Sequence, residues 1–139
     1  MRVVLDTNII VSATIARHGH ADQILRKWHQ GKIELIVSPM ILDEFEDVLT
    51  RSRIVQQQWM TREEVKDLIL RLQTAATMVL DRLDLKVVTD DPNDDKFFEA
   101  ALEGGAEYIV SGDPHLLEVR EYKSIKILAP VKFLKLLYK

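Results

Sequence analysis

The chain contains no cysteine among its 139 residues, which excludes a disulfide framework and a thiolate metal site. This absence is typical of a reducing compartment, and we expect a cytoplasmic protein. The sequence also lacks any uninterrupted run of 18 apolar residues and any secretory signal of a charged segment, a long apolar run and a small-residue cleavage site. We therefore expect no membrane partner.

An excess of positive charge is also missing, because the formal net charge is −3. This balance argues against a broad basic face that coats nucleic acid, although it permits a local basic patch. Apolar residues make up 47% of the chain, and its length suits one domain of the usual ~100–200 residues. No repeat or low-complexity linker divides it, so we predict one globular domain over residues 1–139.

Short β-branched runs alternate with helical patterns along the whole chain. Strands are expected at 1–5, 33–37, 85–89, 106–111 and 125–128, and helices at 8–16, 21–30, 39–50, from 61 onward, after 91 and at 130–138. This alternation predicts an α/β fold with one parallel sheet covered by helices on both faces. The connections place all strand carboxyl ends, and the starts of the following helices, on one edge of the sheet.

Two aspartates stand at the carboxyl ends of predicted strands. Asp6 follows Val3-Val4-Leu5, and Asp113 follows the strand that ends at Ser111. Ligands of open α/β sheets bind outside these strand ends, so both carboxylates are candidates for chemistry. Each also has a structural explanation, because short polar residues are common where a strand turns into a helix, and we expect Asn8 to cap the first helix.

Glu44 is singled out by its position in the helix predicted at 39–50. At 100° per residue it falls between Met40 and Val48 inside the apolar arc. A charged group on a buried stripe costs free energy unless it has a partner. We therefore expect that neutralising Glu44 stabilises the metal-free protein, unless a structural salt bridge holds it.

The densest acidic run precedes the helix that contains Phe98. The pair Asp91-Pro92 predicts a helix start at which Asp94 completes a capping interaction, whereas Asp95 has no capping role and borders the buried stripe. We therefore assign Asp95 to the site, with Asp94 as a supporting residue. The margin between these two neighbours is narrow, because both project near that stripe.

Together, Asp6, Glu44, Asp95 and Asp113 are expected to meet in one cleft at the sheet edge. Four carboxylates raise one another's pKa unless a cation neutralises them, so we predict a bound metal. With only oxygen ligands available, one or two Mg²⁺ or Mn²⁺ ions are favoured over Zn²⁺. Such ions activate water and stabilise the charge that develops on a phosphodiester.

These motifs resemble the PIN-domain nucleases and, within them, the toxin ribonucleases of toxin-antitoxin pairs. The matching stretches are Asp6-Thr7-Asn8, Ser38-Pro39 followed by Glu44, the run from Asp91 to Phe97, and Ser111-Gly112-Asp113. The resemblance implies a five-stranded parallel sheet ordered 3-2-1-4-5. It also implies a metal site of Asp6, Glu44, Asp95 and Asp113, supported by Asn8 and Ser111.

The resemblance further implies a metal-dependent endoribonuclease with an RNA substrate, a protein antitoxin and a small homo-oligomer such as a dimer. We expect basic residues around the cleft to guide the RNA backbone; the candidates are Arg17, Arg26, Arg51, Arg53 and Arg62. Two other Mg²⁺-binding classes fit less well. A haloacid-dehalogenase-type phosphatase requires a second Asp where Asn8 stands, and a receiver module requires an acidic pair at the first strand end. A catalytically silent PIN-like scaffold that binds RNA or a partner protein is the alternative.

Overall fold

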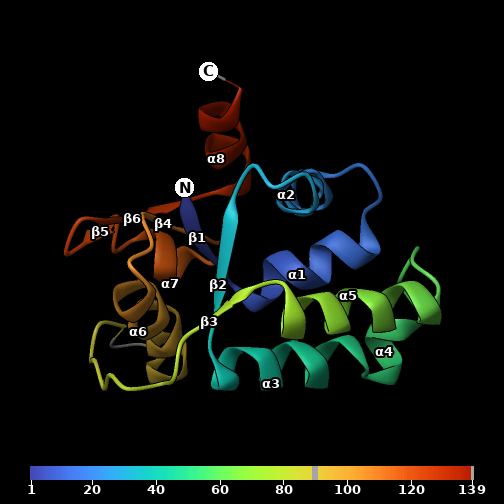
Figure 1. Ribbon diagram of the computed structural model, residues 1–139, viewed down its shortest axis with the longest axis horizontal. Coiled ribbons are helices and arrows are strands. Elements are labelled where there is room, and N and C mark those ends of the chain that lie inside the picture. Colours follow the sequence, from blue (N-terminus) through green and yellow to red (C-terminus); the bar gives the residue numbers. More distant parts are fainter. Residues whose placement is uncertain (89–90, 139) are drawn as a thin grey trace.

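The computed structural model of the protein describes residues 1–88 and 91–138 (Figure 1). Its six-stranded sheet has the order β3-β2-β1-β4-β6-β5. The strands are β1 (Arg2–Leu5), β2 (Glu34–Val37), β3 (Thr77–Met78), β4 (Tyr108–Val110), β5 (Glu121–Tyr122) and β6 (Ile125–Leu128). All neighbouring strands pair in parallel except β5, which is antiparallel to β6.

Helices surround this sheet. They are α1 (Thr7–Ile15), α2 (His20–His29), α3 (Pro39–Leu49), α4 (Ser52–Val55), α5 (Arg62–Thr74), the 3₁₀ helix η1 (Pro92–Asp94), α6 (Asp95–Gly104), α7 (Pro114–Leu117) and α8 (Pro130–Leu137). Helix α6 packs against β1, β2 and β4, whereas α1 packs against α2 and α3, and α3 packs against α5. In Figure 1, α1 to α5 lie to the right of β2, and α6 and α7 lie to its left.

The predicted α/β fold is confirmed. The predicted parallel order 3-2-1-4-5 is also confirmed, with β6 as its fifth strand. The short antiparallel strand β5 is an addition. The third strand was predicted in the wrong place. Residues 85–88 form no strand, and residue 89 lies outside the described residues. The position beside β2 is taken by Thr77–Met78, whereas the backbone N–H groups of Val87 and Val88 donate to the side chain of Asp95.

Capping residues explain where most of the helices begin. Ser38 caps α3 with Pro39 in the first turn, and Thr61 and Glu64 form the predicted capping box of α5. The first helix differs from the prediction, because Asp6 is its N-cap and Asn8 lies inside the helix. The start after Asp91 also differs, because Pro92–Asp94 is a 3₁₀ turn and Asp94 makes no side-chain capping bond to α6.

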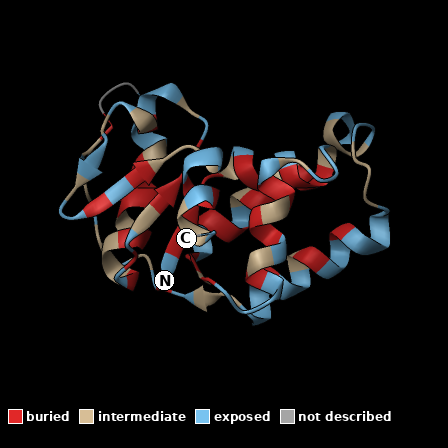
Figure 2. Ribbon diagram, turned by 90° about the horizontal axis from the view of Figure 1, so that it is seen from above, coloured by how far each residue is buried: buried red, intermediate tan, exposed pale blue. Residues whose placement is uncertain are grey.

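The core follows the strands and the helix faces that point toward them (Figure 2). Gly104, at the end of α6, allows that helix to approach the sheet closely. A Cβ atom at this position would lie 2.7 Å from Cγ2 of Ile36 and 3.2 Å from Cγ1 of Val79. Gly105 then ends the helix in the left-handed conformation. Within residues 1–88 and 91–138, no helix is both long and apolar enough to cross a membrane.

Candidate active site

An acidic pocket lies at the carboxyl ends of β1 and β4. Residues from four parts of the chain line it: Asp6, Thr7, Asn8, Val11, Glu44, Val48, Arg51, Arg53, Ile54, Asp91, Asn93, Asp94, Phe97 and Asp113. The parallel sheet and the helices that leave its carboxyl edge therefore bring together five carboxylates that are far apart in the sequence. Such a set of oxygen donors suits a hard divalent cation.

Asp6 and Ser111 are neighbours because β1 and β4 are parallel and in register, with Leu5 opposite Val110. The Ser111 hydroxyl donates to Oδ2 of Asp6, and the backbone N–H of Asn8 donates to Oδ1 at 2.6 Å. Asp6 is only 2% exposed. Burial raises the pKa of its carboxyl, and the nearby charge of Asp113 adds to this effect although the Ser111 and Asn8 hydrogen bonds oppose it.

Asp113 is placed by the same serine. Its backbone N–H donates to Oγ of Ser111 at 2.9 Å, and its Oδ1 accepts from the backbone N–H of His115 at 2.9 Å as the cap of α7. Ser111 is fully buried and contacts both aspartates. Its hydroxyl therefore orients the Asp6 carboxylate and holds the backbone of Asp113 beside it.

Glu44 lies at the edge of the buried face of α3 and its side chain is 27% exposed, whereas Met40, which was predicted to flank it in the apolar arc, is 52% exposed. It has a cationic partner that the sequence reasoning missed. Nζ of Lys96, which is 4% exposed, lies 3.1 Å from Oε1 of Glu44 and donates to the backbone oxygen of Asn93 at 2.8 Å. The hydroxyl of Thr7 donates to Oε2. Burial acts to raise the pKa of Glu44, but the Thr7 and Lys96 contacts outweigh it and lower the pKa.

A weak signal for Lys96 was present in the sequence. Lys96, Ala100 and Gly104 stand four residues apart, and therefore follow one another along one face of α6. Two small residues on the same face as Lys96 indicate that this face is closely packed, so the lysine at its N-terminal end is buried and needs an acidic partner. A long cation at the head of such a row can reach an acid on a neighbouring helix, here Glu44 of α3.

The structure separates Asp94 from Asp95. Asp94 lines the acidic pocket, and burial together with the charges of Asp91 and Asp113 raises its pKa to about 6. Asp95 is not among the pocket's lining residues. It is 5% exposed, and its Oδ1 accepts the backbone N–H groups of Val87 at 3.1 Å and Val88 at 2.7 Å. Its carboxylate thus binds the backbone at Val87 and Val88, before the acidic run. This structural contact was not predicted from the sequence.

The carboxylates are held by donors of the protein itself. In residues 1–88 and 91–138, no three His, Asp or Glu side chains are arranged to hold a metal ion as they stand. Ser111 and the N–H of Asn8 engage Asp6, and Thr7 and Lys96 engage Glu44. The donor chemistry fits Mg²⁺ or Mn²⁺, and binding would require the carboxylates to draw closer around the ion than they stand here.

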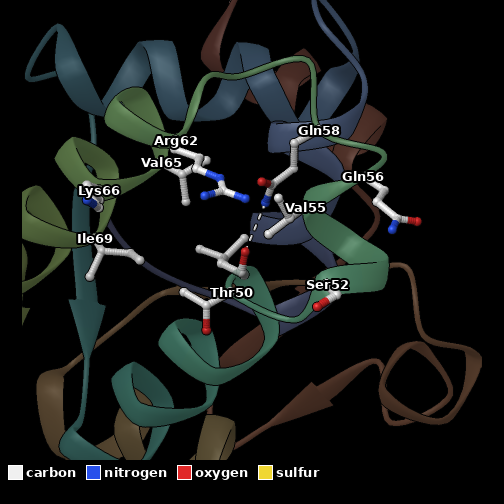
Figure 3. Close-up of a pocket in the computed structure, with 10 residues that line it drawn as sticks. Thr50, Ser52, Val55, Gln56, Gln58, Arg62, Val65, Lys66 and Ile69 are labelled. Carbon is white, nitrogen blue, oxygen red and sulfur yellow. Dashed lines mark hydrogen bonds between the residues drawn. The ribbon is translucent and has the colours of Figure 1, made fainter.

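The basic residues expected around the cleft lie in different places. Arg51 and Arg53 line the acidic pocket, and Arg51 pairs with Asp47 at 2.6 Å. Arg62 lines the neighbouring groove of Figure 3. The other two lie elsewhere: Arg17 stacks on Trp59, and Arg26 pairs with Asp22.

The fold and the pocket define an α/β protein whose acids gather at the carboxyl edge of a parallel sheet. A family model described as "PIN domain" matches residues 2–115, so the chain belongs to the PIN-domain family. It is also 30% identical over 128 residues to an uncharacterized protein of Methanocaldococcus jannaschii, MJ1680; the match covers 91% of this chain and 81% of that protein. This family membership makes nuclease chemistry the activity to test.

Proposed function

We propose that this protein is a metal-dependent endoribonuclease that uses Asp6, Glu44, Asp94 and Asp113. The observation that carries the proposal is that these acids, drawn from four segments, line one pocket at the sheet edge. We place Asp94 in the proposed site instead of Asp95 because Asp94 lines the acidic pocket and Asp95 does not, while Oδ1 of Asp95 accepts two backbone N–H groups. The toxin role, a protein antitoxin and a homodimer remain predictions that rest on the family resemblance.

The residues of the acidic pocket have distinct roles in this proposal. Asp6, Asp94 and Asp113 would hold Mg²⁺ or Mn²⁺, and Glu44 would join them by exchanging the Thr7 or Lys96 contact. When bound, the ion lowers the pKa of an attacking water and neutralises charge on the phosphodiester oxygens. Ser111 orients Asp6, and Arg51 and Arg53 at the rim attract the phosphate that the carboxylates repel.

The proposal is tested with pure protein and a pool of single-stranded RNA in Mg²⁺ or Mn²⁺, with EDTA as a control. We expect cleavage that stops on addition of EDTA and is absent from Asp6→Asn. A circular single-stranded RNA distinguishes endonuclease from exonuclease action, because only an endonuclease cuts a strand without ends. A single-stranded DNA of equal length tests the preference for RNA.

A catalytically silent scaffold that binds RNA or protein is the second candidate. The observation that favours it is that the Asp6 and Glu44 carboxylates are already engaged by donors of the protein. In that case RNA stays intact at every Mg²⁺ and Mn²⁺ concentration, whether or not the protein binds it. The same assay therefore decides between the two functions.

A further inference from the structure

A second groove lies beside the acidic pocket, between the end of α3, the short helix α4 and the first turns of α5 (Figure 3). We refer to it as the α4–α5 groove. Val55, Val65 and Ile69 contribute apolar side chains to its lining. Figure 3 shows the guanidinium of Arg62 extending over the middle of the groove, with Lys66 farther along α5.

Helix α4 separates the groove from the acidic pocket and contributes to both. Arg53 and Ile54 line the acidic pocket, whereas Ser52 and Val55 line the groove. The helix that such a strand would cross is about 10–12 Å wide with its side chains. A polymer that leaves the acidic pocket across α4 therefore reaches the α4–α5 groove within a few nucleotides.

The charges beside α4 are complementary to a phosphodiester backbone. Arg62 and Lys66 are the charged residues among the described lining of the groove, and both are cations. In residues 1–88 and 91–138, no carboxylate forms a salt bridge with Arg53 or Arg62, and the pair between Lys66 and Glu63 is a long 4.0 Å contact between exposed groups. These cations stand out in a chain of net charge −3.

The other residues that line the groove favour contact with RNA of any base sequence. The described lining residues include no aromatic ring on which a base could stack, and Gln58 already donates to the backbone oxygen of Leu49 at 3.2 Å. Apolar side chains such as Val55 and Ile69 accept sugars or base faces of any sequence. Binding in this groove is therefore mainly electrostatic.

We propose that the α4–α5 groove is an extension subsite for single-stranded RNA, in which Arg62 and Lys66 each contact a backbone phosphate beyond the nucleotides in the acidic pocket. This inference rests on the proposed function, because it takes the acidic pocket as the place where the same strand is cut. It implies a substrate that extends several nucleotides to one side of the scissile bond, and an affinity that increases with RNA length.

The test compares Arg62→Gln/Lys66→Gln with Lys126→Gln/Lys132→Gln, which removes the same charge from exposed positions on β6 and α8. Both pairs are made on an Asp6→Asn background, in which the proposed cleavage is blocked. Binding of labelled 4-nucleotide and 12-nucleotide RNAs is measured by fluorescence anisotropy in Mg²⁺ at several salt concentrations. Thermal melts verify that both double variants are folded.

We expect the Arg62/Lys66 variant to bind the 12-nucleotide RNA at least about tenfold more weakly, with a change of less than about twofold for the 4-nucleotide RNA. The slope of log K against log salt should fall by about 1.4, since each phosphate contact with a single strand contributes about 0.7. The Lys126/Lys132 variant should keep both the affinity for the longer RNA and the salt slope of the Asp6→Asn protein.

Two results distinguish a failure of the RNA subsite from a failure of the proposed nuclease function. If the Arg62/Lys66 variant binds both RNAs as the Asp6→Asn protein does, the RNA subsite is refuted, and a protein partner becomes the occupant to seek. Cleavage of the 12-nucleotide RNA by the unaltered protein is measured in parallel. A length-dependent loss of binding without any cleavage would support the groove as an RNA site and reject the nuclease.

Discussion

Asp94 and Asp95 are adjacent, yet their side chains have different surroundings and should respond differently to the same change. Asp94→Asn removes an acid from the proposed site and should abolish metal-dependent cleavage while the protein stays folded. Asp95→Asn weakens two hydrogen bonds to a buried carboxylate, and should destabilise the fold by about 1–3 kcal/mol. Chemical denaturation and RNA cleavage of the two variants check this prediction. Equal stability losses would contradict it.

The raised pKa of Asp94 also predicts how stability changes with pH. The pKa of Asp94 in the folded state is about 6, against 3.8 for an ordinary aspartate side chain. Well below pH 3.8 the group is protonated in both states, and no penalty exists. As pH rises from about 4 through 6, the unfolded chain releases its proton first, so the folded state loses stability.

Asp94→Asn removes this loss of stability, because the asparagine side chain does not ionise. The variant's gain in stability over the unaltered protein should therefore be small at pH 4 and larger at pH 7. Because Asp94 is partly solvated, we expect a gain on the order of 1 kcal/mol. Urea denaturation of both proteins at the two pH values measures it. A constant difference between pH 4 and pH 7 would show that the Asp94 pKa is not raised.

Glu44→Gln should destabilise the metal-free protein, which reverses the expectation from the sequence. The reason is Lys96, whose buried ammonium loses its charged partner in this variant. We expect a loss of roughly 1–3 kcal/mol in melts without divalent ions, less than for a fully buried pair because Glu44 is partly exposed. Asp43→Asn, an exposed acid on the same helix, is the control and should change stability little.

The contact between α6 and the sheet depends on the missing side chain of Gly104. Gly104→Ala places a Cβ 2.7 Å from Ile36 and 3.2 Å from Val79, so either these side chains or α6 itself must shift. The helical preference of Ala offsets part of this cost, and we expect a net loss of about 1–3 kcal/mol in denaturation experiments. Gly112→Ala is the matched control, because no atom lies within 4 Å of its added Cβ. Similar stabilities of the two variants would contradict the close approach.

A bound divalent ion should stabilise the entire domain, because its proposed ligands come from both ends of the chain. At 100 times its dissociation constant, Mg²⁺ or Mn²⁺ should raise the free energy of unfolding by about 2.7 kcal/mol. Thermal melts measure the shift, and NaCl at matched ionic strength controls for charge screening. Asp6→Asn should lose most of the response. An equal shift with NaCl would mean that the carboxylates hold no specific ion.

Several features followed from the sequence alone, because they depend on residues close together in the chain. The alternation of strands and helices, the Ser38 cap and the Thr61 capping box are local patterns, and the structure reproduces them. Parallel connections then place Asp6 and Asp113 at one edge of the sheet without further information. The pairing of Lys96 with Glu44 and the strand at Thr77–Met78 depend on contacts between distant segments.

The different surroundings of Asp94 and Asp95 show what only the tertiary structure decided. Both border the same helix, so periodicity cannot separate them. The 3₁₀ turn at Pro92–Asp94 leaves Asp94 facing the acidic pocket, while Asp95 meets the segment at Val87 and Val88. That segment provides two backbone donors because another strand occupies the place beside β2. The role of Asp95 was thus determined by a strand pairing that its own neighbours in the sequence do not encode.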